Sequence, residues 1–86
     1  MNALEHNLNY NGFDEVSTSK KCRKWEKNSL IFKHCTTQHG YETYTLSLEL
    51  NKFGFVQESF VIWEKYERCV EQLQEAIDWM EKCKNL

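Results

Sequence analysis

The clearest pattern of hydrophobic positions lies between Trp63 and Lys84, near the end of the chain. Hydrophobic residues recur there at helical spacing, and the stripe consists of Tyr66, Val70, Leu73, Ile77 and Met80, widened on one flank by Cys69, Ala76 and Cys83. This spacing is typical of one side of an amphipathic helix. The segment contains neither Gly nor Pro. The pattern therefore predicts one long helix over residues 63–84.

Three segments before this helix are predicted to be strands, residues 29–37, 41–50 and 53–62, and hydrophobic and polar residues alternate cleanly in residues 41–50. Alternation with a period of two is typical of strands with one buried face. A further strand is expected from Cys22 to Lys27. The predicted fold class is α+β: a small antiparallel meander of three to four strands, with the long C-terminal amphipathic helix packed on one sheet face.

The pairing of residues 29–37 with residues 41–50 depends on the turn between them. A two-residue turn at His39-Gly40 would place Cys35 opposite Tyr44, because Gly supplies the positive φ that such turns need. The core face would then hold Ile31, Cys35, Tyr44, Leu46, Leu48 and Leu50. Lys33 would face the same side, which is a conflict. A register shifted by one residue is the alternative, and it would exchange the two faces. Asn51-Lys52 is a second turn candidate, and Gly54 suggests a bulge.

Residues 1–19 are rich in Asn, Ser and Thr, and few of them can be buried. Leu4 and Leu8 could form one helical turn, and Asn11-Gly12 is a turn signal. We expect an irregular N-terminal arm over residues 1–19, followed by a single α+β domain over residues 20–86.

The composition narrows the class of protein. A chain of 86 residues is expected to form one domain, and 41% hydrophobic residues with 14% aromatics indicate a globular protein. The net charge of -2 does not by itself predict nucleic-acid binding. No apolar run is long enough for a membrane helix, and the first residues do not resemble a signal peptide. We expect a cytoplasmic protein, without membrane attachment, whose four cysteines are reduced thiols.

Acidic residues line the side of the predicted helix that faces away from Leu73. This side is either a solvated face or a docking stripe for a basic partner or for the basic segment of the same chain. Trp79 lies beside the apolar stripe, where either the N-terminal segment folds over it or it anchors a dimer or partner interface. The predicted partner-binding residues are Trp79, Glu67, Glu71 and Glu75.

Basic residues concentrate in residues 20–33, where they are interleaved with aromatic residues. Proteins that hold single-stranded nucleic acid combine a positive groove with aromatic stacking platforms. The residues that would form such a site, together with the outer sheet face, are Lys20, Lys21, Arg23, Lys24, Trp25, Lys27, Phe32, His34 and Tyr41. A meander followed by one helix is also broadly similar, in architecture, to the ββββα fold of single-strand-binding transcription coactivators.

Catalytic and metal chemistry have weaker signals. The possible zinc ligands lack the usual spacings; they are Cys22, His34, Cys35, His39, Cys69 and Cys83. Cys22 lies among cations that would favour its thiolate, but no catalytic motif surrounds it. We expect a protein that is not an enzyme and that uses no cofactor and no metal.

Two hypotheses about function follow. The first is a small non-catalytic interaction domain that binds or regulates a protein partner as a homodimer, in which the basic segment of one chain meets the acidic helix of the other. The alternative is a single-stranded nucleic-acid-binding protein that uses residues 20–33 and the exposed sheet face.

Overall fold

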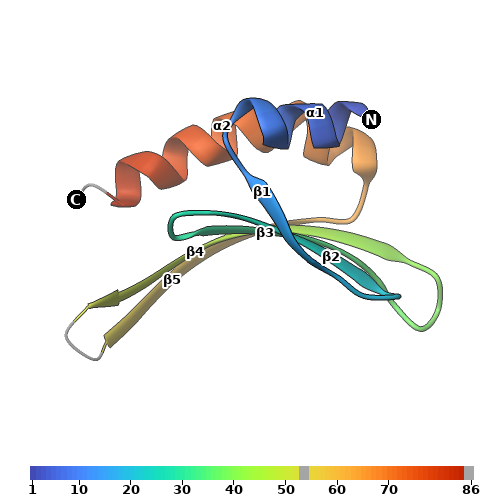
Figure 1. The fold of residues 1–86 in the computed structure, drawn as a ribbon, viewed down its shortest axis with the longest axis horizontal. Coiled ribbons are helices and arrows are strands. Elements are labelled where there is room, and N and C mark those ends of the chain that lie inside the picture. The colour runs from blue at the N-terminus through green and yellow to red at the C-terminus, as the bar shows by residue number, and fades with distance from the viewer. Residues whose placement is uncertain (53–54, 85–86) are drawn as a thin grey trace.

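The protein is an α+β domain built on a five-stranded antiparallel sheet (Figure 1). The computed structural model describes the backbone of residues 1–52 and 55–84, and the side chains of residues 1–49 and 60–83. The elements follow in the order α1 (Ala3–Tyr10), β1 (Asp14–Thr18), β2 (Cys22–Lys27), β3 (Leu30–Thr36), β4 (Glu42–Lys52), β5 (Phe55–Trp63) and α2 (Tyr66–Lys84). The strands lie in the sheet in the same order as in the chain. The predicted fold class is confirmed, with five strands in place of three to four.

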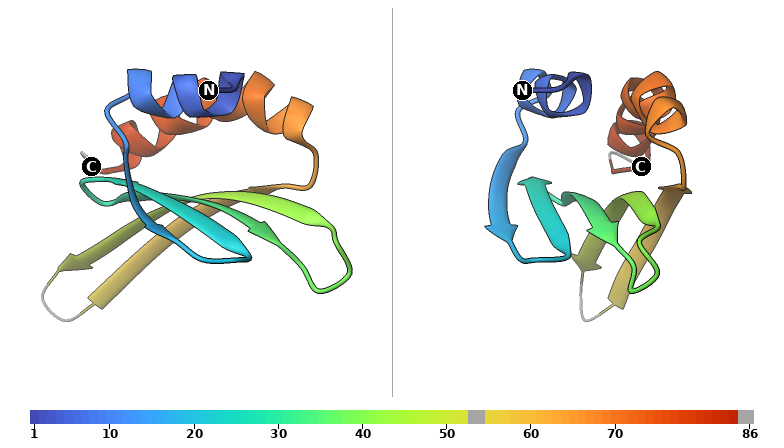
Figure 2. Two further views of the ribbon diagram at one scale, coloured as in Figure 1. Left: turned by 45° about the vertical axis from the view of Figure 1, so that its right-hand side comes forward. Right: turned by 90° about the vertical axis from the view of Figure 1, so that its right-hand side faces the viewer.

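Both helices cover the same face of the sheet (Figure 2). In the right-hand view α1 lies above the β1–β2 side, and α2 lies above β4 and β5, which it contacts. The core between the two layers consists of Leu4, Leu8, Phe13, Trp25, Leu30, Phe32, Tyr44, Leu46, Leu48, Trp63, Cys69, Leu73, Ile77 and Met80. The predicted apolar stripe of α2 is therefore the side that faces the sheet. Neither described helix is long and apolar enough to cross a membrane.

Residues 1–19 form regular structure in place of the expected irregular arm. Asn2 caps α1, because its side-chain oxygen accepts a hydrogen bond of 2.8 Å from the Glu5 amide. Leu4 and Leu8, one helical turn apart, are buried against the core. The chain leaves α1 at Gly12, where φ is +86°, and continues into β1.

The β3–β4 register differs by one residue from the two-residue-turn prediction. Thr37 and Tyr41 are joined by a backbone hydrogen bond of 2.7 Å, so three residues form the loop, and Gly40 takes the positive φ. His34 therefore pairs with Tyr44 where Cys35 had been expected. The shift turns Phe32 into the core and Lys33 out of it, which removes the predicted conflict.

The turn between β4 and β5 also lies later in the chain than the sequence suggested. Asn51 and Lys52 are paired strand residues of β4 and do not form the predicted turn. Gly54, the predicted bulge, lies outside the described residues. β5 continues to Trp63, and α2 begins at Tyr66, three residues after the predicted helix start. Trp63 is thus a buried strand residue, whose indole N–H donates a 2.9 Å hydrogen bond to Gln72 of α2.

Candidate functional site

Two aromatic residues of the predicted nucleic-acid site lie inside the core. Trp25 and Phe32 are buried, and their rings meet edge to face with centroids 5.7 Å apart. They pair across β2 and β3 on the face that the helices cover. The prediction that Phe32 stands on the exposed face of the hairpin is wrong, because the register places its side chain inward, beside Trp25. They cannot serve as stacking platforms in this fold.

Arg23 is held by partners within the chain. Its guanidinium contacts Glu5 of α1 and Glu15 of β1, each at 2.8 Å, and lies 4.7 Å from the centre of the Trp25 ring. The hydrogen bond to Glu15 raises the pKa of Arg23 and, reciprocally, holds the pKa of Glu15 below its usual value. Arg23, a residue of β2, therefore links α1 to the sheet and links β1 to β2.

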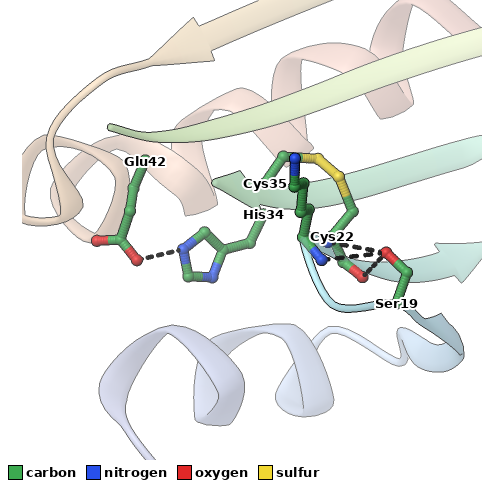
Figure 3. Close-up of a disulfide and its surroundings, with 6 residues drawn as sticks. Ser19, Cys22, His34, Cys35 and Glu42 are labelled. Atoms are coloured by element: carbon green, nitrogen blue, oxygen red, sulfur yellow. Dashed lines mark hydrogen bonds and ion pairs between the residues drawn. A yellow bond between two sulfur atoms is a disulfide. The ribbon is translucent and has the colours of Figure 1, made fainter. Parts of the chain in front are cut away.

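His34 also points to the helix-covered face. Its Nε2 atom lies 3.0 Å from Glu42 Oε1 (Figure 3). Its ring stacks on Tyr44, with the ring centroids 4.4 Å apart. Burial raises the pKa of Tyr44 to about 12, and the nearby Glu42 carboxylate acts in the same direction. Tyr44 in turn meets the Tyr66 ring edge to face. The cluster fixes the start of α2 over β3 and β4.

The remaining residues of the predicted nucleic-acid site do not form one patch. Lys24 is paired with Glu26 at 3.2 Å, and Lys27 lies 3.8 Å from Glu81 of α2. The exposed members lie beside hairpin turns: they are Lys20, Lys21 and Tyr41. The structure thus divides the predicted site between the core, the helix-covered face and the turns.

Two of the four cysteines form a disulfide, contrary to the prediction of four thiols. Cys22 and Cys35 are directly opposite on β2 and β3 and are joined through their sulfur atoms (Figure 3). Disulfides persist mainly in oxidising compartments, and the cytoplasmic location stays a prediction. Cys69 and Cys83 are free, and burial raises the pKa of Cys69 to about 12. Among the described residues, no three metal-binding side chains come together.

The predicted partner-binding residues lie on the solvent side of α2. Glu67, Glu71 and Glu75 are exposed, and Arg68 comes within 3.9 Å of Glu71. Trp79 remains 50% exposed. The N-terminal segment does not fold over it, because α1 packs on another side of α2, where Asn11, the residue that caps α1, pairs its side-chain amide with that of Gln74.

Trp79 borders a shallow groove between α2 and β5. The groove has a volume of about 310 Å³, and its lining consists of Val61, Trp63, Gln72, Glu75, Ala76 and Trp79. On the other face of the sheet, Phe60 and Ile62 of β5 are 62% and 55% exposed. They pair with Ser47 and Thr45, the residues of β4 that alternate with its buried leucines. Exposed apolar side chains therefore flank the β5 edge on both faces.

The two edges of the sheet differ. β1 is short, carries Asp14 and Glu15, and has an irregular register around Val16. Such features protect an edge strand against pairing with another chain. β5 has nine residues, contains neither Pro nor Lys and only one charged residue, Glu58, and is hydrogen-bonded to β4 alone within the described part of the chain. The β5 edge is thus the unprotected edge. We call this region the β5–α2 surface: the β5 edge with Phe60, Val61, Ile62, Ala76 and Trp79.

Comparisons with protein-family models, with curated proteins and with solved structures find no match to this chain.

Sequence reasoning found Trp79 but did not include β5 in the partner-binding site. A signal was present, since Phe60 and Ile62 alternate with Val61 in a strand that lacks Lys and Pro. This pattern indicates an exposed apolar edge only when β5 is known to lie at the edge of the sheet, and the strand order is not evident from the sequence.

Proposed function

We propose that this chain is a small non-catalytic interaction domain that binds a protein partner along the β5–α2 surface. The single observation that carries the proposal is the unprotected β5 edge, flanked by exposed apolar side chains on both faces. An extended segment that adds to such an edge gains main-chain hydrogen bonds, and its side chains reach both faces in alternation.

The energetic argument is the same for any occupant of this surface. Phe60, Ile62 and Trp79 are large apolar side chains that remain half or more exposed. Covering them removes apolar surface from water, which contributes about 25 cal/mol per Å². Trp is also among the residues most enriched at interface hot spots. A partner with an extended apolar segment fits these requirements.

The nucleic-acid alternative has less support than the protein-interaction proposal. Two aromatic residues that it needs, Trp25 and Phe32, are buried, and Arg23 is engaged by two carboxylates. Lys20 and Lys21 remain free to attract phosphate, but without aromatic neighbours from β2 and β3 they give only a general electrostatic attraction. We therefore do not propose it as a function.

The proposal is tested with displayed peptides of random sequence. Peptides enriched on the immobilised full chain are synthesised and titrated into isotope-labelled protein. We expect backbone amide shifts to concentrate in residues 60–63 and 72–79, and Trp79→Ala to weaken binding at least about tenfold. Tyr10→Ala is the matched control, because Tyr10 is also an exposed aromatic residue and lies on α1, away from β5. Failure to enrich any peptide, or shifts confined to residues 20–47, would refute the proposal.

A further inference from the structure

We infer that the partner of the β5–α2 surface is a second copy of this chain, with β5 pairing antiparallel to its symmetry mate. This inference rests on the proposed function, because it names the partner for the same surface. The two copies would form one continuous ten-stranded sheet.

The first argument is the geometry of an edge strand paired with itself. A twofold axis that relates two antiparallel strands side by side must stand perpendicular to the sheet, so each face of one copy continues as the same face of the other. Phe60 and Ile62 of both copies then lie on the same open face, with the two Phe60 side chains diagonal neighbours when the axis is at Ser59. Val61 of both copies lies on the helix-covered face. On each face of the joined sheet, the exposed apolar side chains of one β5 strand therefore lie beside the same apolar side chains of the other copy. An unrelated strand need not carry apolar residues at these positions.

The second argument is the position of α2. It contacts both β4 and β5, so it lies over the β5 side of the sheet. The perpendicular twofold would place α2 of the second copy on the same face of the joined sheet, across the β5–β5 junction. The side chains at this seam are Ala76 and Trp79, which line the groove beside β5. In such a dimer, the second copy covers Trp79, which is half exposed in a single chain.

The charges along this flank are compatible with an antiparallel copy. Glu75 and Lys82 lie on either side of Trp79 and border the same surface depression. When two antiparallel α2 helices meet near Trp79, Glu75 of one copy lies toward Lys82 of the other. The same depression also carries Glu71 and Asp78, so Lys82 of each copy offsets part of an acidic rim.

The third argument is the end of the β4–β5 hairpin. β3 pairs with β4 only as far as Leu48, so the pairs from Leu50–Gln57 to Lys52–Phe55 belong to two strands alone. Figure 1 shows these strand ends extending beyond the rest of the sheet and away from α2. A two-stranded ribbon is marginally stable by itself in water. Pairing along all of β5 would place the axis at Ser59 and give this ribbon a third strand.

The test begins with the mass of the full chain by sedimentation equilibrium across a wide concentration range. We expect a species of twice the chain mass of 10.4 kDa. Phe60→Lys and Trp79→Glu should each weaken the dimer at least about tenfold, since both residues lie at its centre. The matched controls are Val16→Lys on the opposite edge strand and Tyr10→Glu on α1, which should leave it unchanged. All four positions are 48% exposed or more, so circular dichroism should report a folded chain in every case.

A cysteine scan then tests the pairing itself. In a Cys83→Ser background, single cysteines are placed at positions 58, 59, 60, 61 and 62 and oxidised mildly; Cys69 is buried and the other two cysteines are paired. Twofold antiparallel pairing predicts that one position cross-links to itself, and that the two positions flanking it cross-link to each other when the variants are mixed.

The outcomes separate the inference from the proposed function. A strict monomer that still binds the selected peptides overturns the inference and leaves the proposed function standing. A dimer that Phe60→Lys and Trp79→Glu do not weaken, or that yields no cross-link at positions 58–62, also overturns the inference. A monomer that binds no peptide overturns both.

Discussion

Trp25 shows how a single position can mislead when it is judged by its neighbours in sequence. It lies in the most basic part of the chain, yet β2 pairing places its ring against Phe32 in the core. Charge clustering is a property of the sequence, whereas the face that a side chain takes depends on strand register. The interleaved cations surround this ring in the sequence but do not expose it in the fold.

Trp25→Ala should therefore destabilise the domain. The substitution removes a buried aromatic side chain, which typically costs about 3–5 kcal/mol of unfolding free energy. Trp79→Ala is the matched control, and in protein dilute enough to be monomeric it should cost under about 1 kcal/mol because half of that side chain is already exposed. Urea unfolding followed by circular dichroism measures both. Equal losses for the two variants would contradict the assigned positions.

Cys69 makes the stability of the fold depend on alkaline pH. Burial raises its pKa from 9.0 to about 12, so the unfolded chain loses this proton at a lower pH than the folded chain does. The folded state then binds more protons, and its stability falls as pH rises from about 9 towards 12. Tyr44, whose pKa is also raised to about 12, adds to the same decline from about pH 10.

Unfolding free energies measured between pH 8 and pH 11 check this dependence. Cys69→Ala should lose stability less steeply over that interval, although it is less stable at pH 8 because a buried side chain has been shortened. A slope equal to that of the unsubstituted chain would show that Cys69 does not titrate as described.

At the scale of elements, the sequence predicted those whose hydrophobic pattern is long and regular. The apolar stripe of α2 and the alternation in β4 were sufficient for this, and α2 differs from its prediction only at its start. The first nineteen residues were harder, because α1 buries only Leu4 and Leu8. Its other signals are local: the Asn2 cap, Glu5 three residues later, and the Asn11-Gly12 stop.

The β3–β4 loop shows a second limit. Two-residue and three-residue loops are both compatible with Gln38-His39-Gly40, and they differ by one residue in register. The conflict at Lys33 was the only sequence signal against the shorter loop. In the fold, burial of Leu30 and Phe32 in the core selects the three-residue loop and its register.

The integration of α1 into the core can be measured. Leu8→Ala should lower the unfolding free energy by about 2–5 kcal/mol, because Leu8 is fully buried between α1 and the rest of the core. Asn2→Ala should cost about 1 kcal/mol through loss of the helix cap. Chemical denaturation gives both values. A loss below about 0.5 kcal/mol for Leu8→Ala would mean that the N-terminal residues do not belong to the cooperative unit.

For the whole molecule, the separation into a basic segment and an acidic helix suggested contacts between chains. In the fold several of these charges meet within one chain, since Lys27 lies near Glu81, and Arg23 binds Glu5 and Glu15. The separation of charges along a sequence does not reveal which acidic and basic side chains form ion pairs within one chain. The unprotected edge could not be predicted either, because it follows from the strand order.

The most direct test of the β5–α2 surface is amide hydrogen exchange, followed by NMR on dilute and on concentrated protein. Amides of β5 that face away from β4 should exchange rapidly in dilute protein and slow at least about tenfold when a second chain pairs with the edge. The outward-facing amides of β1 should exchange at the same rate in both samples. Unchanged exchange along β5, at a concentration where the chain has associated, would contradict the assignment of this edge as the binding surface.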